Sequence, residues 1–321
     1  MAKKKYKLKK DVFLYLAVLI VAIALINKGI NAYKTYKYHQ TIEYKLITVG
    51  YTKKDIKTLS KYLNEKELLK LTKEKKKEKL ITLMSNKLYL HKHYKDYLDY
   101  IDIFPNKTID EVIKTINLHL NYAFYEDTKP TDLSKEYLIL VNKYNYLEED
   151  FTPEDIITIS TKYSWGSYGT HSIRKEVFDA FLKMHEDANQ NNIYLMINSS
   201  YRDFKSQTIV YNNYETSHGE VYADKYAARP GYSEHQTGLA LDIFSIDGAL
   251  RSTFKDTEAY AWLKDNAHKY GFILRYPEGK EDITGFSFEP WHYRYVGVEA
   301  AKYIYEKQIT LEEYYVYNIE K

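Results

Sequence analysis

The 321-residue sequence predicts an α+β fold that follows an N-terminal helical region. Residues 51–125 repeat apolar side chains at three- and four-residue spacing, which is typical of amphipathic helices. Beyond them, helical segments are interspersed with short strand-like stretches at 193–198, 238–244 and 285–297, without the regular rhythm of a βαβ protein. The length of the chain favours about two folded units.

The composition limits the chemistry that the chain can perform. It contains no cysteine, which excludes disulfides, thiolate nucleophiles and iron–sulfur clusters. Any metal ion must therefore be held by histidine and carboxylate side chains. The formal net charge of +3 is too small to indicate a nucleic-acid partner, and we expect none.

The N-terminus is predicted to anchor the chain in a membrane. Lysine-rich residues 1–10 precede an unbroken apolar run, Val12–Ile26. Such a run makes about 22 Å of helix, and its extension to Ile30 with flanking lysines that reach the interface would span a hydrocarbon core of ~30 Å. A cleaved signal peptide is the alternative, although the following residues offer only a poor match to a cleavage site. We predict an uncleaved single-pass anchor over residues 1–32, with the lysine cluster in the cytoplasm and the rest of the chain outside.

A linker at 33–50 leads to a helical module at 51–130, for which the sequence indicates no role. Thr108 and Glu111 have the spacing of a capping box and predict the start of a helix. The basic run at 73–80 is predicted to be a solvated helix face, with binding of anionic wall polymers or lipid as an open alternative. The histidines of this region have no carboxylate at ligand spacing and are expected to be surface or packing residues: His91, His93 and His119.

The polar stretch at 128–134 marks the start of a second domain, which we place at 131–321. Within it, Ser172–Asn189 has the pattern of an amphipathic helix. The stretch at 193–198 has the pattern of a strand, and a new helix is expected after Asp203.

A candidate metal site begins in PGYSEHQTGLALDIF, at 230–244. Side chains alternate along a strand, so Asp242 is expected on the face opposite to the neighbouring Leu241 and Ile243. His235 stands just before Gly238, where the chain can turn and bring the imidazole over the same face as Asp242.

The remaining groups of this site come from EPWH, at 289–292. Pro290 cannot remain in a strand ladder, and the resulting kink would let Glu289 and His292 converge. Two histidines and one carboxylate are the ligand set of a catalytic zinc ion with one position open to water. The predicted zinc ligands are therefore His235, Asp242 and His292, with Glu289 as a general base beside the metal.

The same residues allow two other interpretations. His235 and Asp242 could form a buried hydrogen-bonded pair while His292 packs in an aromatic strand. Ser233, His235 and Asp242 could also form a nucleophilic triad, but the second histidine in EPWH and the alternation of the strand favour the metal site.

These motifs resemble those of a known family. SEHQTGLALD is similar to the S-x-H-x-x-G-x-A-x-D pattern, and EPWH to the E-x-W-H pattern, of the LAS zinc metallopeptidases, which include D-Ala-D-Ala carboxypeptidases, lysostaphin-type enzymes and hedgehog-like folds. Roughly, residues 137–317 resemble the VanY-type D-alanyl-D-alanine carboxypeptidases, also through SSYRDFKSQ and LEEYY. The resemblance implies a LAS or hedgehog-like domain, a small antiparallel sheet with flanking helices. The helical module before it has no resemblance that we can name.

The resemblance also implies roles for residues that face the substrate. Arg202 and Gln207 match a YR-x4-Q element, and Ser233 matches the motif serine that helps to hold the substrate. A guanidinium can pair with the free carboxylate of a peptide that ends in D-Ala, or with the oxyanion that develops at the scissile carbonyl. Arg202 is therefore a candidate for both catalysis and substrate binding.

We predict a membrane-anchored, extracytoplasmic bacterial zinc carboxypeptidase that removes the C-terminal D-Ala from peptidoglycan stem peptides. The alternative is an L,D-carboxypeptidase that acts on tetrapeptide stems, because the same fold and metal serve both bonds. A non-catalytic wall-binding protein that works through residues 51–125 is a third hypothesis, which the completely filled motifs disfavour.

Overall fold

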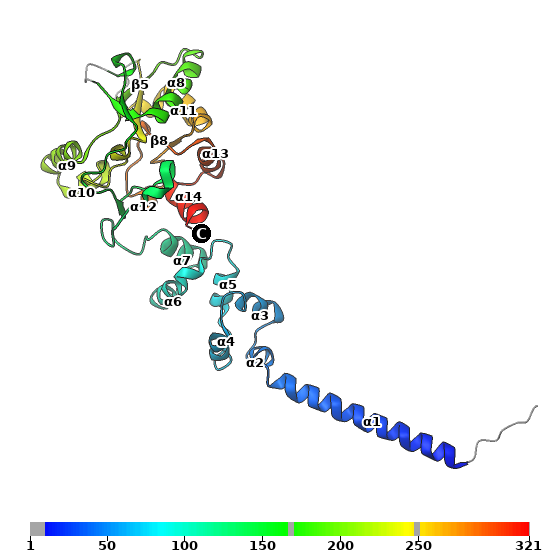
Figure 1. The fold of residues 1–321 in the computed structure, drawn as a ribbon. Helices are drawn as coiled ribbons and strands as arrows, with labels where there is room; N and C mark the ends of the chain where they lie inside the picture. The colour runs from blue at the N-terminus through cyan, green and yellow to red at the C-terminus, as the bar shows by residue number, and fades with distance from the viewer. Residues whose placement is uncertain (1–9, 166–169, 247–250, 321) are drawn as a thin grey trace, which may run out of the picture. The chain divides into compact units, whose positions relative to one another are not determined.

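A computed structural model describes residues 10–165, 170–246 and 251–320. The chain divides into two compact units, Met1–Ile113 and Lys114–Lys321 (Figure 1). The first is helical. The second contains strands and helices in mixed order, and the predicted α+β class is confirmed.

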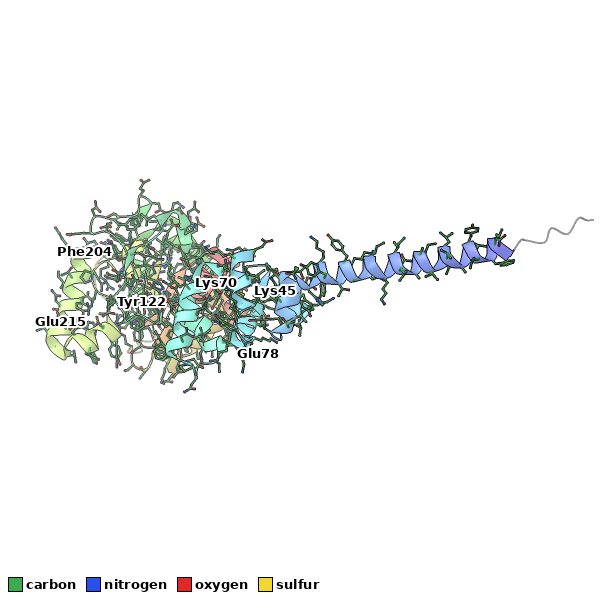
Figure 2. All side chains as sticks on the ribbon, turned by 90° about the horizontal axis from the view of Figure 1, so that it is seen from below. Lys45, Lys70, Glu78, Tyr122, Phe204 and Glu215 are labelled. Atoms are coloured by element: carbon green, nitrogen blue, oxygen red, sulfur yellow. The ribbon has the colours of Figure 1, made fainter. Side chains whose placement is uncertain are left out.

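The first unit begins with one long helix, α1 (Lys10–His39). Over Asp11–His39 it is the one helix of the described residues that is long and apolar enough to cross a membrane. Nearly all of its side chains between Asp11 and His39 are exposed, and Figure 2 shows side chains that project from this helix. Residues 33–50, predicted as a linker, are largely helical, since α1 continues to His39 and α2 (Ile42–Thr48) follows.

Short helices follow α2 in this unit. They are α3 (Lys53–Leu59), α4 (Glu65–Leu71), α5 (Glu78–Ser85), α6 (Tyr94–Ile103) and α7 (Ile109–Asn117), which runs across the boundary between the units. Capping boxes start α3, α4 and α7. The predicted capping box before α7 is confirmed: Thr108 N–H donates to Glu111 Oε2 over 2.8 Å, and Glu111 N–H donates to Thr108 Oγ1 over 3.2 Å. The basic run at 73–80 is a connection up to Lys77 rather than a helix face, and most of it is exposed.

A four-stranded antiparallel sheet organises the second unit, with the order β5-β6-β8-β7. Its strands are β5 (Leu195–Ser199), β6 (Ala240–Ser245), β7 (Phe272–Leu274) and β8 (His292–Tyr295). Three of them overlap the predicted stretches: β5 and β6 each start two residues later and end one residue later than predicted, β8 covers only a short part of 285–297, and β7 was not predicted. Two small sheets accompany it: β1 (Lys129–Pro130) with β2 (Asn145–Tyr146), and β3 (Ile156–Thr158) with β4 (Ser172–Arg174).

Helices cover the apolar face of the main sheet. Leu241, Ile243 and Tyr293 share one core with Phe181 of α8 (Lys175–Asn189) and Leu263 of α11 (Glu258–Asn266). The predicted helix at 172–189 is therefore correct only from Lys175 onward, because the three residues before it pair with β3.

The other helices of this unit are α9 (Phe204–His218), α10 (Glu220–Tyr226), α12 (Glu281–Thr284), α13 (Val298–Lys307) and α14 (Leu311–Tyr314). In Figure 1, α9 and α10 lie well apart from α8 and α11. The site described next lies on the face of the sheet opposite to α8 and α11 and is bordered by α9 and α10.

Candidate metal centre

The pairing of β6 with β8 brings the first two predicted ligands together. Asp242 lies directly opposite His292 in the antiparallel register. Directly paired residues point to the same face of a sheet, about 5 Å apart at their Cβ atoms. Leu241 and Ile243 are in the core on the other face, as the alternation in the sequence predicts.

A one-turn helix, η4 (Glu234–Thr237), carries His235 to the same face. Its N-cap is Ser233, whose Oγ accepts from His235 N–H at 3.3 Å. Gly238 ends the turn at φ 66°, a left-handed conformation that favours glycine. A Cβ on Gly238 would lie 2.8 Å from the side chains of Arg174 and Ile156, so this position needs glycine for space as well.

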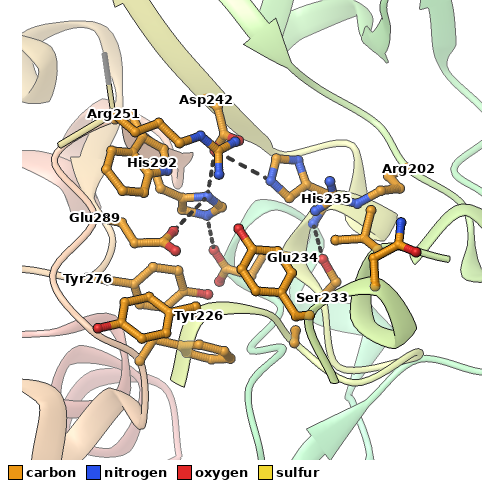
Figure 3. Close-up of a pocket in the computed structure, with 16 residues that line it drawn as sticks. Arg202, Tyr226, Ser233, Glu234, His235, Asp242, Arg251, Tyr276, Glu289 and His292 are labelled. Atoms are coloured by element: carbon orange, nitrogen blue, oxygen red, sulfur yellow. Dashed lines mark hydrogen bonds and ion pairs between the residues drawn. The ribbon is translucent and has the colours of Figure 1, made fainter. Parts of the chain in front are cut away.

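The three predicted ligands converge in a buried cluster, which we call the donor cluster: His235, Asp242 and His292 (Figure 3). One possible ligand atom from each lies within 4.8 Å of the others, and among the described residues this is the one group with such geometry. Asp242 Oδ1 is 3.0 Å from His292 Nδ1 and 3.5 Å from His235 Nε2. The side chains have the types and the spacing that suit a divalent metal ion.

The tautomer of His235 is set by the backbone. Its Nδ1 lies 2.7 Å from the carbonyl oxygen of Ser200, which can only accept, so Nδ1–H donates. The lone pair of a neutral His235 ring is therefore on Nε2, which faces Asp242. Burial and the nearby Arg202 guanidinium lower the pKa of His235 to about 4, which keeps the ring neutral at pH 7.

The opposite charges of Asp242 and the two histidines shift the pKa values of Asp242 and His292. Burial alone would raise the pKa of Asp242, but the two imidazoles outweigh it and hold that pKa well below its usual range. Burial alone would lower the pKa of His292, but the carboxylates of Asp242 and Glu234 outweigh it and raise that pKa to about 9. The cluster therefore combines the buried Asp242 anion, the lone pair of a neutral His235 and a His292 ring that has to lose a proton when it binds a metal ion.

Glu289 approaches the cluster through a tight turn. His292 N–H donates to the Glu289 carbonyl over 3.1 Å, which closes a turn around Pro290 and Trp291. This turn places Glu289 Oε2 3.8 Å from His292 Nδ1, so the expected convergence occurs. Burial raises the pKa of Glu289 to about 7, a value suited to a group that exchanges protons near neutral pH.

The residues predicted to face the substrate occupy different positions. Arg202 and Ser233 line the pocket in front of the donor cluster. Gln207 is buried and uses both ends of its amide within the protein: Oε1 accepts from Arg202 Nε over 2.6 Å, and Nε2 donates to the Ala228 carbonyl over 2.7 Å. Gln207 thus holds Arg202 in place and does not line the pocket.

The pocket has a volume of about 330 Å³ and a mixed lining of charged and aromatic groups. The sequence reasoning did not single out Arg251, Tyr226 and Tyr276, which also line it. Arg251 Nη2 lies 3.4 Å from Asp242 Oδ2, and its guanidinium packs over the Trp291 ring. No motif signals this arginine, which follows the strand by several residues.

The sequence reasoning also passed over Glu234, an acidic residue that faces His292. It stands between Ser233 and His235 in the recognised motif. Its Oε2 is 3.5 Å from His292 Nε2. Its place between two predicted site residues, Ser233 and His235, is a signal that could have identified it.

Comparisons with known proteins show which family this chain resembles. The family model described as VanY, D-alanyl-D-alanine carboxypeptidase, matches residues 170–298. The putative carboxypeptidase YodJ of Bacillus subtilis is 40% identical over 205 residues, which cover 61% of this chain and 75% of YodJ. A D-alanyl-D-alanine carboxypeptidase of Enterococcus faecium is 35% identical over 208 residues, which cover 61% of this chain and 65% of that protein.

A solved structure extends the likeness to the fold. The LD-carboxypeptidase LdcB aligns with a TM-score of 0.55 at 40% identity, over 59% of this chain and 90% of LdcB.

Proposed function

Because this chain belongs to the VanY family of D-alanyl-D-alanine carboxypeptidases, we propose that it removes the C-terminal D-alanine from peptidoglycan stem peptides with the help of a zinc ion. The observation that carries the proposal is the donor cluster beside Glu289 in a pocket that Arg202 also lines. Membership of this family makes the chain a peptidase, so the hypothesis of a non-catalytic wall-binding protein is not retained.

The residues present fit a zinc ion. His235 would bind through Nε2 and His292 through Nδ1, with one oxygen of Asp242 as the third ligand. This set leaves a position open toward the pocket. A zinc ion held there would lower the pKa of a water molecule and polarise the scissile carbonyl.

Glu289 would handle the proton. A carboxylate with a pKa of about 7 can accept the proton of the attacking water and then give it to the amine of the departing D-alanine. The water oxygen is then bonded to the carbonyl carbon, the peptide bond is broken and Glu289 has returned to its initial state. The same carboxylate thus serves as base and acid in turn.

Arg202 would bind negative charge on the substrate. Its guanidinium can pair with the terminal carboxylate of the peptide or with the oxyanion at the scissile carbonyl. Gln207 would act through Arg202, by holding Nε, and Ser233 would contact the substrate from the start of η4.

We further propose that α1 anchors the chain in the cell membrane of a bacterium, with the catalytic domain outside. The domain limits proposed from the sequence are the anchor at 1–32, the helical module at 51–130 and the catalytic domain at 131–321. Retention of the full chain in membranes after an alkaline wash would support the anchor, and its release would contradict it.

A second candidate activity is supported by the likeness to LdcB, an LD-carboxypeptidase. The deciding experiment incubates the full chain, in detergent and loaded with zinc, with pentapeptide and tetrapeptide stems, and identifies the products by mass. Release of D-alanine from the pentapeptide alone supports the D,D activity, and release from the tetrapeptide supports the L,D activity. A chelator should abolish either release, and no release from either stem would refute the proposal.

A further inference from the structure

His292 has two ring nitrogens in different surroundings. Nδ1 faces Asp242 and Glu289, whereas Nε2 is on the other side of the ring and faces Glu234, which also borders the pocket. The imidazole can present Nδ1 to a metal ion only if the proton of the neutral ring stays on Nε2. The orientation of the ring therefore depends on what lies behind Nε2.

Glu234 is built to receive that proton. Glu234 is only 1% exposed, and its two carboxylate oxygens have different surroundings. Oε1 accepts from Arg275 Nε over 2.8 Å and from Arg294 Nη1 over 2.6 Å. Oε2 has no hydrogen-bond partner and faces His292 Nε2, which also has none. Two buried polar atoms without partners, 3.5 Å apart and facing each other, form a hydrogen bond after a small shift of either group.

Three further charges hold Glu234 in this position, and with Glu234 they form what we call the ion network: Glu234, Arg275, Arg294 and Glu312. Arg275 follows β7 and makes a bidentate pair with Glu312 of α14, over 2.6 and 3.0 Å. Arg294 lies on β8, two residues after His292, and also donates to the Ile139 carbonyl over 2.7 Å. All four side chains are buried, and their formal charges cancel.

We propose that Glu234 is a positioning residue for the metal centre: its Oε2 accepts the Nε2 proton of His292 and so directs Nδ1 toward the metal. The Arg275–Glu312 pair extends this support to the C-terminal helix α14. The inference rests on the proposed zinc site. Carboxylates that orient a metal-binding histidine typically contribute 10- to 100-fold to metal affinity.

The test measures zinc affinity of the full chain by competition with a chromogenic chelator. Glu234→Gln keeps the size of the side chain and removes its charge, so we expect about 10- to 100-fold weaker zinc binding. The visible spectrum of the cobalt-substituted protein should also change, because it reports the geometry of the ligands. Turnover should recover at saturating zinc, since the substitution is expected to weaken metal binding and leaves Glu289 in place.

A matched pair of variants in α14 keeps the test decisive if Glu234→Gln does not fold. Glu312→Gln weakens the hold on Arg275 and should reduce zinc affinity by less than Glu234→Gln does. Glu313→Gln, one residue on, alters the capping box and the contact with Lys280 but not the ion network, and should leave zinc affinity unchanged.

The outcomes separate this inference from the proposed function. Wild-type affinity and cobalt spectrum in a folded Glu234→Gln variant would overturn the inference and leave the zinc site intact. If that variant does not fold, wild-type affinity in Glu312→Gln would overturn it. Failure of the wild-type chain itself to bind zinc would instead refute the proposed function.

Discussion

Two groups of buried charges meet at His292, and they differ in how their charges are matched. In the ion network, two arginines and two glutamates neutralise one another through short hydrogen bonds. In the donor cluster, the carboxylate of Asp242 and the rings of two histidines face a common point, with the partly exposed Glu289 nearby. The formal charges of the ion network cancel within the network, whereas we propose that the donor cluster is complete only with a cation from outside.

The difference implies different consequences of substitution. Loss of one member of a balanced buried network leaves an uncompensated charge, which destabilises the fold by about 3–5 kcal/mol. Loss of one member of the donor cluster removes a place for a cation, so metal binding and turnover are affected most. The predictions that follow test this distinction from the largest expected effect to the smallest.

The largest effect is expected for His292→Ala, which removes one of three proposed ligands. The purified variant should retain no zinc after dialysis and should release no D-alanine, as measured by metal analysis and by product mass. His185→Ala is the control, because His185 lies on α8, away from the cluster, and its Nδ1–H donates to the Leu195 carbonyl. Stoichiometric zinc in His292→Ala would remove this residue from the ligand set.

Glu289→Gln should separate catalysis from metal binding. Removal of a general base typically reduces the rate by about 10²- to 10⁴-fold. Because Glu289 is proposed to exchange protons and not to bind the metal, the zinc content should equal that of the wild type. Measurement of kcat together with zinc per chain checks both points, and full activity in this variant would sink the assignment.

Arg275→Met should have the opposite profile. It leaves Glu234 and Glu312 buried without their shared cation, and the free energy of unfolding should fall by about 3–5 kcal/mol. Urea denaturation in the presence of a chelator measures the effect apart from zinc. Arg251→Met is the comparison, because the Arg251 side chain is 48% exposed and its pairing should contribute less than about 1 kcal/mol. Equal losses of unfolding free energy in Arg275→Met and Arg251→Met would contradict the distinction drawn between the ion network and the donor cluster.

The donor cluster could be predicted from the sequence, and the ion network could not. Alternation along one strand places Asp242 opposite to its apolar neighbours, and a proline turn places Glu289 beside His292; the motif resemblance indicated that these two halves belong to one site, and the pairing of β6 with β8 joins them. The partners of Arg275 are 41 residues before it and 37 residues after it, on η4 and α14, and the tertiary fold brings them together. No local pattern encodes such contacts.

Other differences between sequence and structure have the same origin. Gln207 matches a substrate-facing element, but the tertiary fold supplies the Ala228 carbonyl that draws its amide inward. Residues 172–174 fit a helix pattern, but β3 offers them a strand partner. The lysines at 73–77 were expected on a helix, but Lys76 pairs with Asp55 and Lys77 with Glu74 in the connection before α5, which starts at Glu78.

Gln207→Ala should produce a moderate effect confined to the substrate. It removes the acceptor of Arg202 Nε, so the guanidinium is no longer held at the pocket wall. A hydrogen bond to a charged group is worth about 1.5–3 kcal/mol, so kcat/KM should fall about tenfold or more. Zinc affinity should stay unchanged, because Gln207 touches no member of the donor cluster. A normal kcat/KM would show that Arg202 does not depend on this contact.

Lys143 provides a third way to bury a charge, without any carboxylate partner. Its Nζ donates to the Asp224 carbonyl over 2.6 Å and lies 4.5 to 5.2 Å from the ring centres of Phe124, Tyr125 and Phe286. Burial lowers the pKa of Lys143 to about 8, against about 10.4 in an unfolded chain. Between these two values the unfolded chain binds more protons than the folded chain, so stability rises with pH.

Lys143→Met should therefore remove a pH dependence and leave the metal site intact. Between pH 7 and pH 9 the wild-type chain should gain about 1 kcal/mol of unfolding free energy relative to the variant. Urea denaturation of both proteins at pH 7, 8 and 9, with a chelator present, measures this difference, and the tyrosines common to both proteins cancel. A difference in unfolding free energy that does not change with pH would mean that the aromatic rings and the carbonyl stabilise the ammonium as well as a carboxylate does. Burial of a charge without a counter-ion would then not be the costly arrangement that the ion network avoids.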